Sequence, residues 1–324
     1  MPRSFIVYNF NKNILRLHPT YKANIYESKF PAYGSRLVYG TSGLGGIWGE
    51  VNEPESIDCI LYALENGITS FDTAPSYNNA ELYLGKALKQ WKVKLPFIST
   101  KVGRLRGDSA FDVKLNYSPR GMKESVLRSL EILGVDKVDL LFLHEPQWIP
   151  LEKIQEVLET FLSFKGQGFA EMLGIGGNPS VAFMPYLSNK YFDVISTFCM
   201  MDACNLSAFN EIIPVTLKEN ISVYAASALH FSLLGNRFDQ YTKEDPGIAE
   251  ISKTDIQNAI YLNELAKKYD LCLATLAQRY LFSIEEATRV VIGARKISQI
   301  ESTISDWKAG VLQKNIFDEI TEIV

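Results

Sequence analysis

The sequence predicts a (β/α)8 barrel, a closed ring of eight parallel strands with a helix after each strand. From residue 36 onward, eight short apolar runs alternate with longer segments of helical period, which is the pattern of repeated β-α units. The runs are apolar at nearly every position rather than at alternate ones, as expected of strands buried on both faces. An open, doubly wound sheet is the alternative fold for this pattern.

The predicted strands are short and rich in Val, Ile, Leu, Phe and Tyr, which favour extended backbone. The segments between them carry apolar residues at helical spacing. We expect the strands at residues 36–40, 69–72, 97–101, 138–144, 172–176, 194–198, 222–226 and 289–293. We expect the helices at 54–66, 80–90, 119–134, 151–167, 179–189, 207–219, 255–269 with 275–283, and 297–309.

Start and stop signals support several of these helices. Pro54 and Pro119 stand in the first turn of their helices, where a missing N–H leaves no hydrogen bond unmade. Gly67 and Gly134 follow two helices and are suited to the left-handed conformation with which many helices end.

Two segments do not fit the repeat. We expect residues 1–35 to be an aromatic-rich extension that packs against the barrel and caps its bottom, and residues 36–324 to form the barrel domain. Residues 227–254 are a long connection of mixed polarity, which we interpret as a lid over a ligand, because long loops inside compact domains tend to be functional. A tolerated surface insertion is the alternative. The tail after Trp307 is short, so we expect no long C-terminal loop over the site.

Charge and hydropathy argue against several partners. The chain has 324 residues and a net charge of −4, with no dense basic run, so we expect no nucleic-acid partner. No apolar run approaches the ~20 residues that cross a bilayer. The first residues also lack the apolar block of a signal peptide. We therefore expect a soluble, cytoplasmic protein without a membrane partner; the oligomeric state is not indicated.

Cysteine and histidine are scarce. The four cysteines are too few for a disulfide framework in a chain of this length, so we expect free thiols. With three histidines, a multi-histidine metal site is not expected, and we assign no metal.

Polar side chains stand at the carboxyl ends of neighbouring predicted strands, where the active site of such a barrel lies. Asp72 ends the second strand, Lys101 the third and His144 the fourth, and Tyr77 follows Asp72 by five residues. Because buried charges need partners, we expect Asp72 and Lys101 to pair. A purely structural ion pair is the alternative, but it does not explain why a tyrosine and a histidine converge on the same rim.

The expected position of Lys101 predicts that the pKa of Tyr77 is lowered. An ammonium at about 4 Å favours a phenolate by about 4 kcal/mol at an effective dielectric constant near 20, which corresponds to about three pKa units. We therefore expect the pKa of Tyr77 to fall from about 10 to near 7, so that this residue exchanges a proton at cellular pH.

These four residues, in this order and on successive strands, resemble the catalytic tetrad of the aldo-keto reductase superfamily. The similarity runs from about residue 36 to 310 and is greatest to the branch of L-galactose, L-fucose and D-threo-aldose dehydrogenases, through residues 40–46, 71–77 and 226–234. The resemblance implies an enzyme that transfers hydride between a nicotinamide cofactor and an aldose or other small aldehyde or alcohol, as a sugar 1-dehydrogenase. In it Tyr77 exchanges the proton, Lys101 tunes Tyr77, Asp72 holds Lys101, and His144 orients the substrate oxygen.

The resemblance also implies a cradle for NAD or NADP. Ser227 and Leu229 would bind the pyrophosphate, and Arg295 and Lys296 would face the adenosine ribose, where a cation favours a 2′-phosphate. The basic pair, Arg295 and Lys296, indicates NADP, whereas the resemblance to the aldose dehydrogenase branch indicates NAD. We expect NAD. The residues at the family's cofactor positions are Gly176, Gly177, Ser227, Leu229, Gly293, Arg295, Lys296 and Gln299, with the glycine pair standing where the family has a Ser-Asn pair for the carboxamide.

Aromatic residues on the loops around the tetrad offer flat faces on which the C–H surface of a sugar could lie. Arg104, Glu145 and Gln147 stand near them and could bind hydroxyl groups. Packing of the rim is the alternative role. The candidate substrate residues are Trp48, Tyr117 and Trp148.

Two other functions remain open for this sequence. The first is a cofactor-binding regulatory or channel-associated subunit of the same family, with incidental reductase turnover. The second is an unrelated barrel enzyme, such as an aldolase that uses Lys101 as a Schiff base.

Overall fold

Eight parallel strands close into a barrel in the computed structural model, which describes residues 17–324. Around the ring the order is β1-β10-β9-β8-β7-β6-β3-β2, and β1 closes the ring by pairing with β10. The predicted (β/α)8 barrel is confirmed, and the doubly wound alternative is wrong. The strands are β1 (Leu37–Gly40), β2 (Ser70–Asp72), β3 (Phe97–Val102), β6 (Val138–His144), β7 (Ala170–Gly176), β8 (Val194–Phe198), β9 (Ser222–Ala226) and β10 (Arg289–Gly293).

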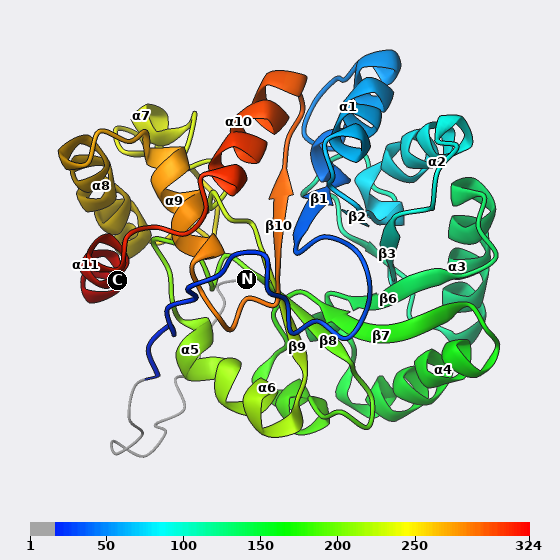
Figure 1. Ribbon diagram of the computed structural model, residues 1–324. Helices are drawn as coiled ribbons and strands as arrows, with labels where there is room; N and C mark the ends of the chain where they lie inside the picture. Colours follow the sequence, from blue (N-terminus) through cyan, green and yellow to red (C-terminus); the bar gives the residue numbers. More distant parts are fainter. Residues whose placement is uncertain (1–16) are drawn as a thin grey trace.

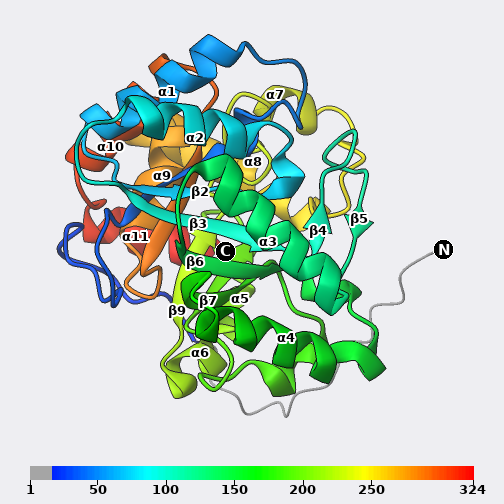
Figure 2. The ribbon, with the colours of Figure 1, turned by 90° about the vertical axis from the view of Figure 1, so that its right-hand side faces the viewer.

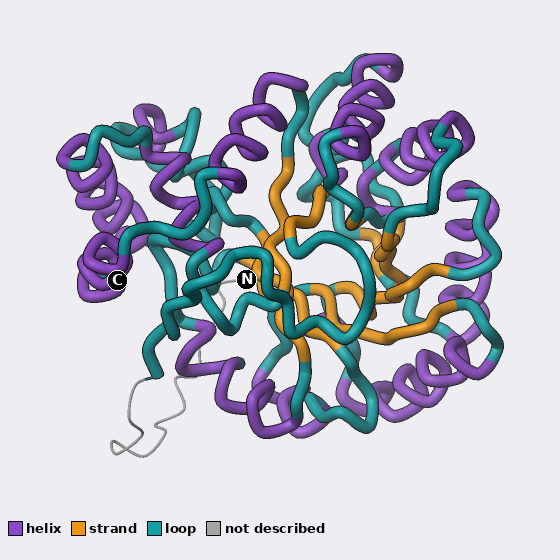
Figure 3. Tube along the Cα trace, in the orientation of Figure 1, coloured by secondary structure: helices purple, strands orange, loops and turns teal. Residues whose placement is uncertain are grey.

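Helices surround the barrel (Figures 1 and 3). Asn52 and Ser118 accept hydrogen bonds at the first turns of α1 and α3, and Gly134 ends α3 in the left-handed conformation. None of the helices in residues 17–324 has both the length and the apolar character needed to cross a membrane. These helices are α1 (Glu53–Glu65), α2 (Ala80–Gln90), α3 (Pro119–Leu133), α4 (Ile154–Gly166), α5 (Ala208–Glu211), α6 (Ile213–Glu219), α8 (Lys253–Lys268), α9 (Leu273–Phe282) and α10 (Ile297–Lys308).

Proline changes two of the predicted helices. The α-helix predicted at 179–189 is instead a 3-10 helix, Val181–Tyr186, with Pro185 inside it. The helix predicted at 207–219 is divided into α5 and α6, and proline lies in the first turn of α6. Proline lacks the N–H that an uninterrupted α-helix needs at these positions.

Two short helices are absent from our predictions. The long connection after β9 contains α7 (Phe238–Tyr241), and the chain ends in α11 (Lys314–Ile323). Figure 1 shows α11 beside α8, on the outside of the barrel, and Lys268 of α8 forms an ion pair with Glu319 at 2.8 Å. This C-terminal helix therefore packs on the barrel wall.

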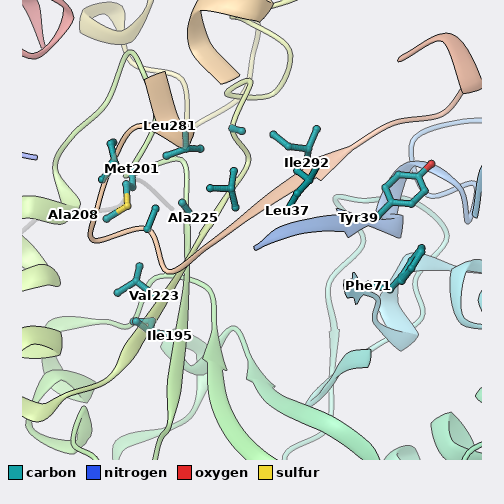
Figure 4. Close-up of a cluster of buried hydrophobic side chains, with 14 of the residues drawn as sticks. Leu37, Tyr39, Phe71, Ile195, Met201, Ala208, Val223, Ala225, Leu281 and Ile292 are labelled. Atoms are coloured by element: carbon teal, nitrogen blue, oxygen red, sulfur yellow. The ribbon is translucent and has the colours of Figure 1, made fainter. Parts of the chain in front are cut away.

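Apolar side chains form two layers. The outer layer lies between strands and helices and includes Phe71, Ile195 and Leu281 (Figure 4). Both faces of the strands are thus covered, as the uninterrupted apolar runs indicate. The inner layer fills the barrel with Phe30, Val38, Phe97, Leu140, Phe142, Met172, Val194, Tyr224 and Val291.

Residues 17–35 cross the end of the barrel at which the strands begin (Figure 1). Phe30 packs against Phe97 and Tyr224, with ring centroids 5.6 and 5.5 Å apart. The guanidinium of Arg289 lies 3.9 Å from the centre of the Phe30 ring and donates a 2.8 Å hydrogen bond to the Tyr224 hydroxyl. This part of the extension therefore covers the bottom of the barrel; its first 16 residues lie outside the described part of the chain.

The loops that follow the strands gather at the opposite end, the mouth of the barrel (Figure 2). An antiparallel hairpin, β4 (Arg104–Leu105) and β5 (Lys114–Leu115), rises there after β3. The connection between β9 and α8 lies at the same end. That it acts as a lid stays a prediction.

We expect Phe30→Ala to lower the free energy of unfolding by about 3 to 5 kcal/mol, because it removes a buried ring and one of the aromatic contacts of the Arg289 guanidinium, which also lies 4.1 Å from the Phe97 ring centre. Turnover at a temperature where the protein is folded should not change, since the predicted active site lies at the other end of the barrel. Chemical denaturation measures the first effect and steady-state kinetics the second. Tyr26→Ala is the matched control, because that ring is 66% exposed. Equal losses of unfolding free energy in both variants would contradict a stabilising role for Phe30 at the bottom of the barrel.

Candidate active site

A buried ion pair joins two neighbouring strands at the mouth. Lys101 Nζ lies 2.6 Å from Asp72 Oδ2 and donates a second hydrogen bond to the Thr73 carbonyl at 2.9 Å. The Ser99 hydroxyl donates to Asp72 Oδ1 at 2.8 Å. Removing two charges from water is costly unless each has close partners. Here the ammonium and both carboxylate oxygens have them.

Tyr77 lies beside this pair because the chain turns sharply after β2. The 3-10 helix Pro75–Tyr77 brings the centre of the Tyr77 ring to 4.8 Å from Lys101 Nζ. Gly45 lies directly against this turn and accepts a hydrogen bond from the Asn79 N–H at 3.1 Å. A Cβ atom at residue 45 would come within 1.7 Å of the Tyr77 carbonyl oxygen. Glycine is therefore required at this position for Tyr77 to keep its place.

His144 completes the group at the end of β6. Its ring and the Tyr77 ring are perpendicular, with centroids 6.1 Å apart. Burial, the Lys101 charge and the Arg104 charge hold the pKa of His144 well below its ordinary value of 6.5. At neutral pH the ring is therefore a neutral imidazole, with one nitrogen that donates and one that accepts. The structure thus brings all four predicted tetrad residues together.

The pKa of Tyr77 is shifted in the direction opposite to our expectation. Burial raises it by more than Lys101 lowers it, and the Asp72 charge raises it further, so that the net shift is upward from 10. The predicted value near 7 is wrong, because it counted the ammonium but not the cost of removing a phenolate from water. Tyr77 is therefore a neutral phenol at neutral pH and can donate a proton.

Unpartnered polar atoms gather around the tetrad. Within residues 17–324, nine buried side-chain polar atoms lack a hydrogen-bond partner, and five of them belong to this rim. Most buried polar atoms in folded proteins are paired, so such a concentration needs an explanation. It marks this rim as suited to a polar ligand. The five atoms are Thr73 Oγ1, Ser76 Oγ, Arg104 Nε, His144 Nδ1 and Glu145 Oε2.

Four of the predicted cofactor residues lie at the same mouth, where β7 and β9 end and their loops begin. Gly176 packs on the stem of Lys101, where a Cβ atom would lie 3.5 Å from Lys101 Cδ. Gly177 has a φ of +120°. Ser227 accepts a hydrogen bond from a cysteine thiol at 3.0 Å, and Leu229 is half-buried in the same loop. The glycine pair leaves a surface without side chains beside the tetrad.

The other four predicted cofactor residues lie between the end of β10 and the first turn of α10. Gln299 Oε1 accepts a hydrogen bond from the Arg295 N–H at 2.8 Å, and the Arg295 guanidinium donates to the Glu50 carbonyl at 2.9 Å. Lys296 and Gly293 are exposed. No side chain caps the start of α10, so its first N–H groups are open to an anion. This donor set fits the phosphates of a dinucleotide.

Tyr117 has its hydroxyl engaged with the backbone. That hydroxyl lies 2.8 Å from the carbonyl oxygens of both His144 and Glu145. Glu145 has a φ of +53°, which is costly for a residue other than glycine. In this position Tyr117 holds the strained turn after His144.

The two tryptophans are the more accessible of the predicted substrate residues. Trp48 is 42% exposed and meets Phe111 and Phe231 edge-on, with both centroid distances 5.9 Å. Trp148 is 45% exposed and lies in the 3-10 helix that follows the histidine strand. Both therefore present ring surface near the mouth.

A second ion pair lies beside His144. Arg104 Nη1 is 2.6 Å from Glu145 Oε1, and Arg104 Nη2 donates to the Ala110 carbonyl at 2.6 Å. The sequence predicts that Arg104 and Glu145 lie near the tetrad, but it does not predict the hairpin that brings them together. Its strands are only two residues long, which is too short for a periodic signal.

The sequence does not predict one buried charged cluster at the mouth. His230 lies between Asp202 and Asp255, at 2.8 and 3.6 Å. Twenty-eight positions separate His230 from Asp202, so no local motif reveals the contact. The side chains of Asp202, Cys204 and His230 are close enough to hold a metal ion, but two backbone N–H groups already donate to Asp202 Oδ1. We therefore interpret the group as a hydrogen-bonded cluster.

A parallel barrel with Asp, Tyr, Lys and His converging at its carboxyl end defines a class of oxidoreductase. The model of the aldo/keto reductase family matches residues 36–324, and the chain belongs to this family. The predicted family is confirmed, and the protein is an NAD(P)-dependent oxidoreductase.

The relatives agree with the predicted branch. D-arabinose 1-dehydrogenase of Saccharomyces cerevisiae is 30% identical over 303 residues, which cover 83% of this chain and 87% of that protein. L-galactose dehydrogenase of Arabidopsis thaliana is 28% identical, covering 84% of this chain and 83% of the relative. An aldo-keto reductase of Bacillus halodurans in its holo form has the same fold, with a TM-score of 0.74 at 23% identity over 95% of this chain and 97% of that one.

We expect Gly45→Ala to lower kcat by at least about tenfold, since the added methyl group displaces the Tyr77 turn and a 1 Å misplacement of a reacting group is known to cost about a hundredfold. Steady-state kinetics measure the effect. Gly166→Ala is the control, because nothing lies within 4 Å of a Cβ atom at that position. An unchanged kcat in Gly45→Ala would show that the turn does not depend on this contact.

Proposed function

We propose that this enzyme is a sugar 1-dehydrogenase, which oxidises an aldose at C1 with NAD and, in a separate reaction with NADH, reduces small aldehydes to alcohols. The observation that carries the proposal is the position of the Tyr77 phenol beside the buried Lys101 ammonium and the neutral His144 ring. The names of the two relatives, a D-arabinose and an L-galactose dehydrogenase, support an aldose as the substrate class.

The tetrad moves a proton to or from one substrate oxygen. A nicotinamide bound at the mouth supplies or accepts the hydride. In reduction the Tyr77 phenol donates its proton to the carbonyl oxygen, while His144 donates a hydrogen bond to the same oxygen. In oxidation the Tyr77 phenolate accepts the proton of the substrate hydroxyl.

Lys101 stabilises the phenolate in both directions. Burial lowers the pKa of Lys101, but the Asp72 charge and Tyr77 raise it by more, so that the net shift is upward from 10.5. Lys101 therefore remains an ammonium when Tyr77 has lost its proton. Asp72 serves to keep that charge in place.

The cofactor residues favour NAD. Ser227, Leu229 and the uncapped start of α10 would hold the diphosphate. A 2′-phosphate would need a free cation at the adenosine ribose. The Arg295 guanidinium is engaged with the Glu50 carbonyl, so Lys296 alone of the predicted basic pair would be left for a 2′-phosphate, which weakens the argument for NADP.

The Arg104–Glu145 pair supports a substrate with several hydroxyl groups. Its side chains are 14% and 19% exposed, and both Glu145 Oε2 and Arg104 Nε lack partners. A carboxylate accepts from hydroxyls, and a guanidinium donates to them. Trp48 and Trp148 would contact the C–H surface of the sugar.

The proposal is tested by the absorbance of the reduced nicotinamide, followed for a panel of aldoses and simple aldehydes with NAD and with NADP. Turnover of an aldose, faster with NAD than with NADP, supports it. Turnover of simple aldehydes alone contradicts a sugar dehydrogenase. Cofactor binding without any turnover would instead support a cofactor-binding subunit.

Because the pKa of Tyr77 is raised, oxidation and reduction should depend differently on pH. Oxidation needs the phenolate, so its rate should rise through the neutral and mildly alkaline range; reduction uses the phenol and should stay constant there. Rate profiles in both directions measure this. Tyr77→Phe should lower both rates by about 10² to 10⁴, the usual contribution of a general acid or base. An oxidation rate that is already constant at neutral pH would contradict the raised pKa.

Glu145→Gln should lower kcat/KM for an aldose by about tenfold, since a hydrogen bond to a charged group is worth about 1.5 to 3 kcal/mol. For a small aldehyde without hydroxyl groups, kcat/KM should change by less than about threefold, or 0.7 kcal/mol. The ratio of the two values is the measurement, and Glu152→Gln, at an exposed position, is the control. Equal losses for both substrates would show that the pair holds the loop and does not bind the sugar.

A further inference from the structure

The backbone after β9 turns left-handed at three successive residues. His230, Phe231 and Ser232 have φ values of +46°, +53° and +71°, and Ser227, just before them, has +64°. Residues other than glycine rarely adopt this conformation, because the Cβ atom approaches the backbone too closely. Several such residues in a row persist only where the surrounding structure holds them.

A buried charged cluster holds this turn. The His230 side chain is completely buried, and its Nδ1 lies 2.8 Å from Asp202 Oδ2. Its Nε2 faces Asp255 Oδ2 at 3.6 Å, and Asp255 is itself fixed by a capping box with Ser252 at the start of α8. Although burial lowers it, Asp202 and Asp255 raise the pKa of His230 to about 10. The side chain is therefore an imidazolium between two carboxylates.

The turn is tied directly to the predicted diphosphate-binding residues. The His230 N–H donates to the Ser227 carbonyl at 2.8 Å, and the Leu234 N–H donates to the Leu229 carbonyl at 3.1 Å. Because His230 is hydrogen-bonded to Ser227 and follows Leu229 directly in the chain, a displacement of His230 would move both residues. The cluster lies on the loops after β8 and β9 and on α8, apart from the tetrad on β2, β3 and β6.

We propose that His230 is a positioning residue for the cofactor: its buried contacts with Asp202 and Asp255 fix the left-handed turn and thereby present Ser227 and Leu229 to the cofactor diphosphate. This inference rests on the proposed function, because it requires those two residues to bind NAD. His230 acts through the turn and does not take part in the proton transfer.

The test compares the binding of NAD, NADH and NADP to the full-length parent and to His230→Gln by isothermal titration calorimetry, at a temperature where circular dichroism shows both to be folded. We expect Kd to rise by at least about tenfold, which is 1.4 kcal/mol. The value of kcat at saturating cofactor should change much less, because the tetrad is not touched. Adding Ser232→Gly to His230→Gln should recover part of the affinity, since glycine adopts the left-handed conformation without strain.

Lys22→Met is the matched control, because it breaks a buried ion pair with Glu285 at the opposite end of the barrel. It should destabilise the protein and leave Kd unchanged. If His230→Gln does not fold, Asp255→Asn takes its place, with a smaller rise in Kd expected.

The outcomes separate the two proposals. A raised Kd in the His230 or Asp255 variant, with partial recovery by Ser232→Gly, supports the positioning role. A parent that binds NAD and a folded variant with the same Kd overturn this inference and leave the proposed function standing. A rise in Kd in Lys22→Met as large as that in His230→Gln overturns it too, since general destabilisation would then be the cause. A parent that binds neither NAD nor NADP overturns the proposed function and this inference together.

Discussion

The buried ion pair between Lys101 and Asp72 is the interaction on which the rest of the mouth depends. Two charges have left water, and each would cost several kcal/mol without its partner. Adjacent strands of a closed barrel meet this requirement, because they fix the two side chains at 2.6 Å without relying on flexible loops. The pair carries no net charge, but its ammonium is the end that faces the Tyr77 ring. A phenolate is therefore stabilised at one place on the rim.

Burial limits how strongly the Tyr77 phenolate is stabilised. Because the phenol is removed from water, its pKa stays above 10 despite the ammonium, and the low dielectric that strengthens the attraction also penalises the phenolate. The same burial, with the Lys101 and Arg104 charges, keeps His144 neutral. At rest the rim therefore holds two neutral groups, a phenol and an imidazole, beside one ammonium. Such a site is prepared to donate a proton, and it accepts one only as the pH rises.

The barrel and the tetrad could be predicted because both depend on local pattern and chain order. Asp72, Lys101 and His144 stand at the ends of apolar runs, and parallel strands bring their ends to one rim. The direction of the Tyr77 shift could not be predicted, since it depends on burial, which a sequence does not give. The His230 cluster could not be predicted, because its three residues come from the loop after β8, the loop after β9 and helix α8. Proline explains the broken helices, since Pro185 lies inside the segment 179–189.

Contacts between loops make the mouth a connected ring. The Arg295 guanidinium reaches the Glu50 carbonyl, and Trp48, from the same loop as Glu50, packs against Phe231 in the left-handed turn. Trp48 also meets Phe111 of the hairpin that carries Arg104. The loop after β1 thus touches segments assigned to the adenosine, the diphosphate and the sugar. A cofactor bound under such a ring would meet loops already held by one another, so less conformational entropy is lost on binding than with independent loops. These contacts would hold the bound cofactor in place, while the Lys101–Asp72 pair and the Gly45 contact hold Tyr77 beside it.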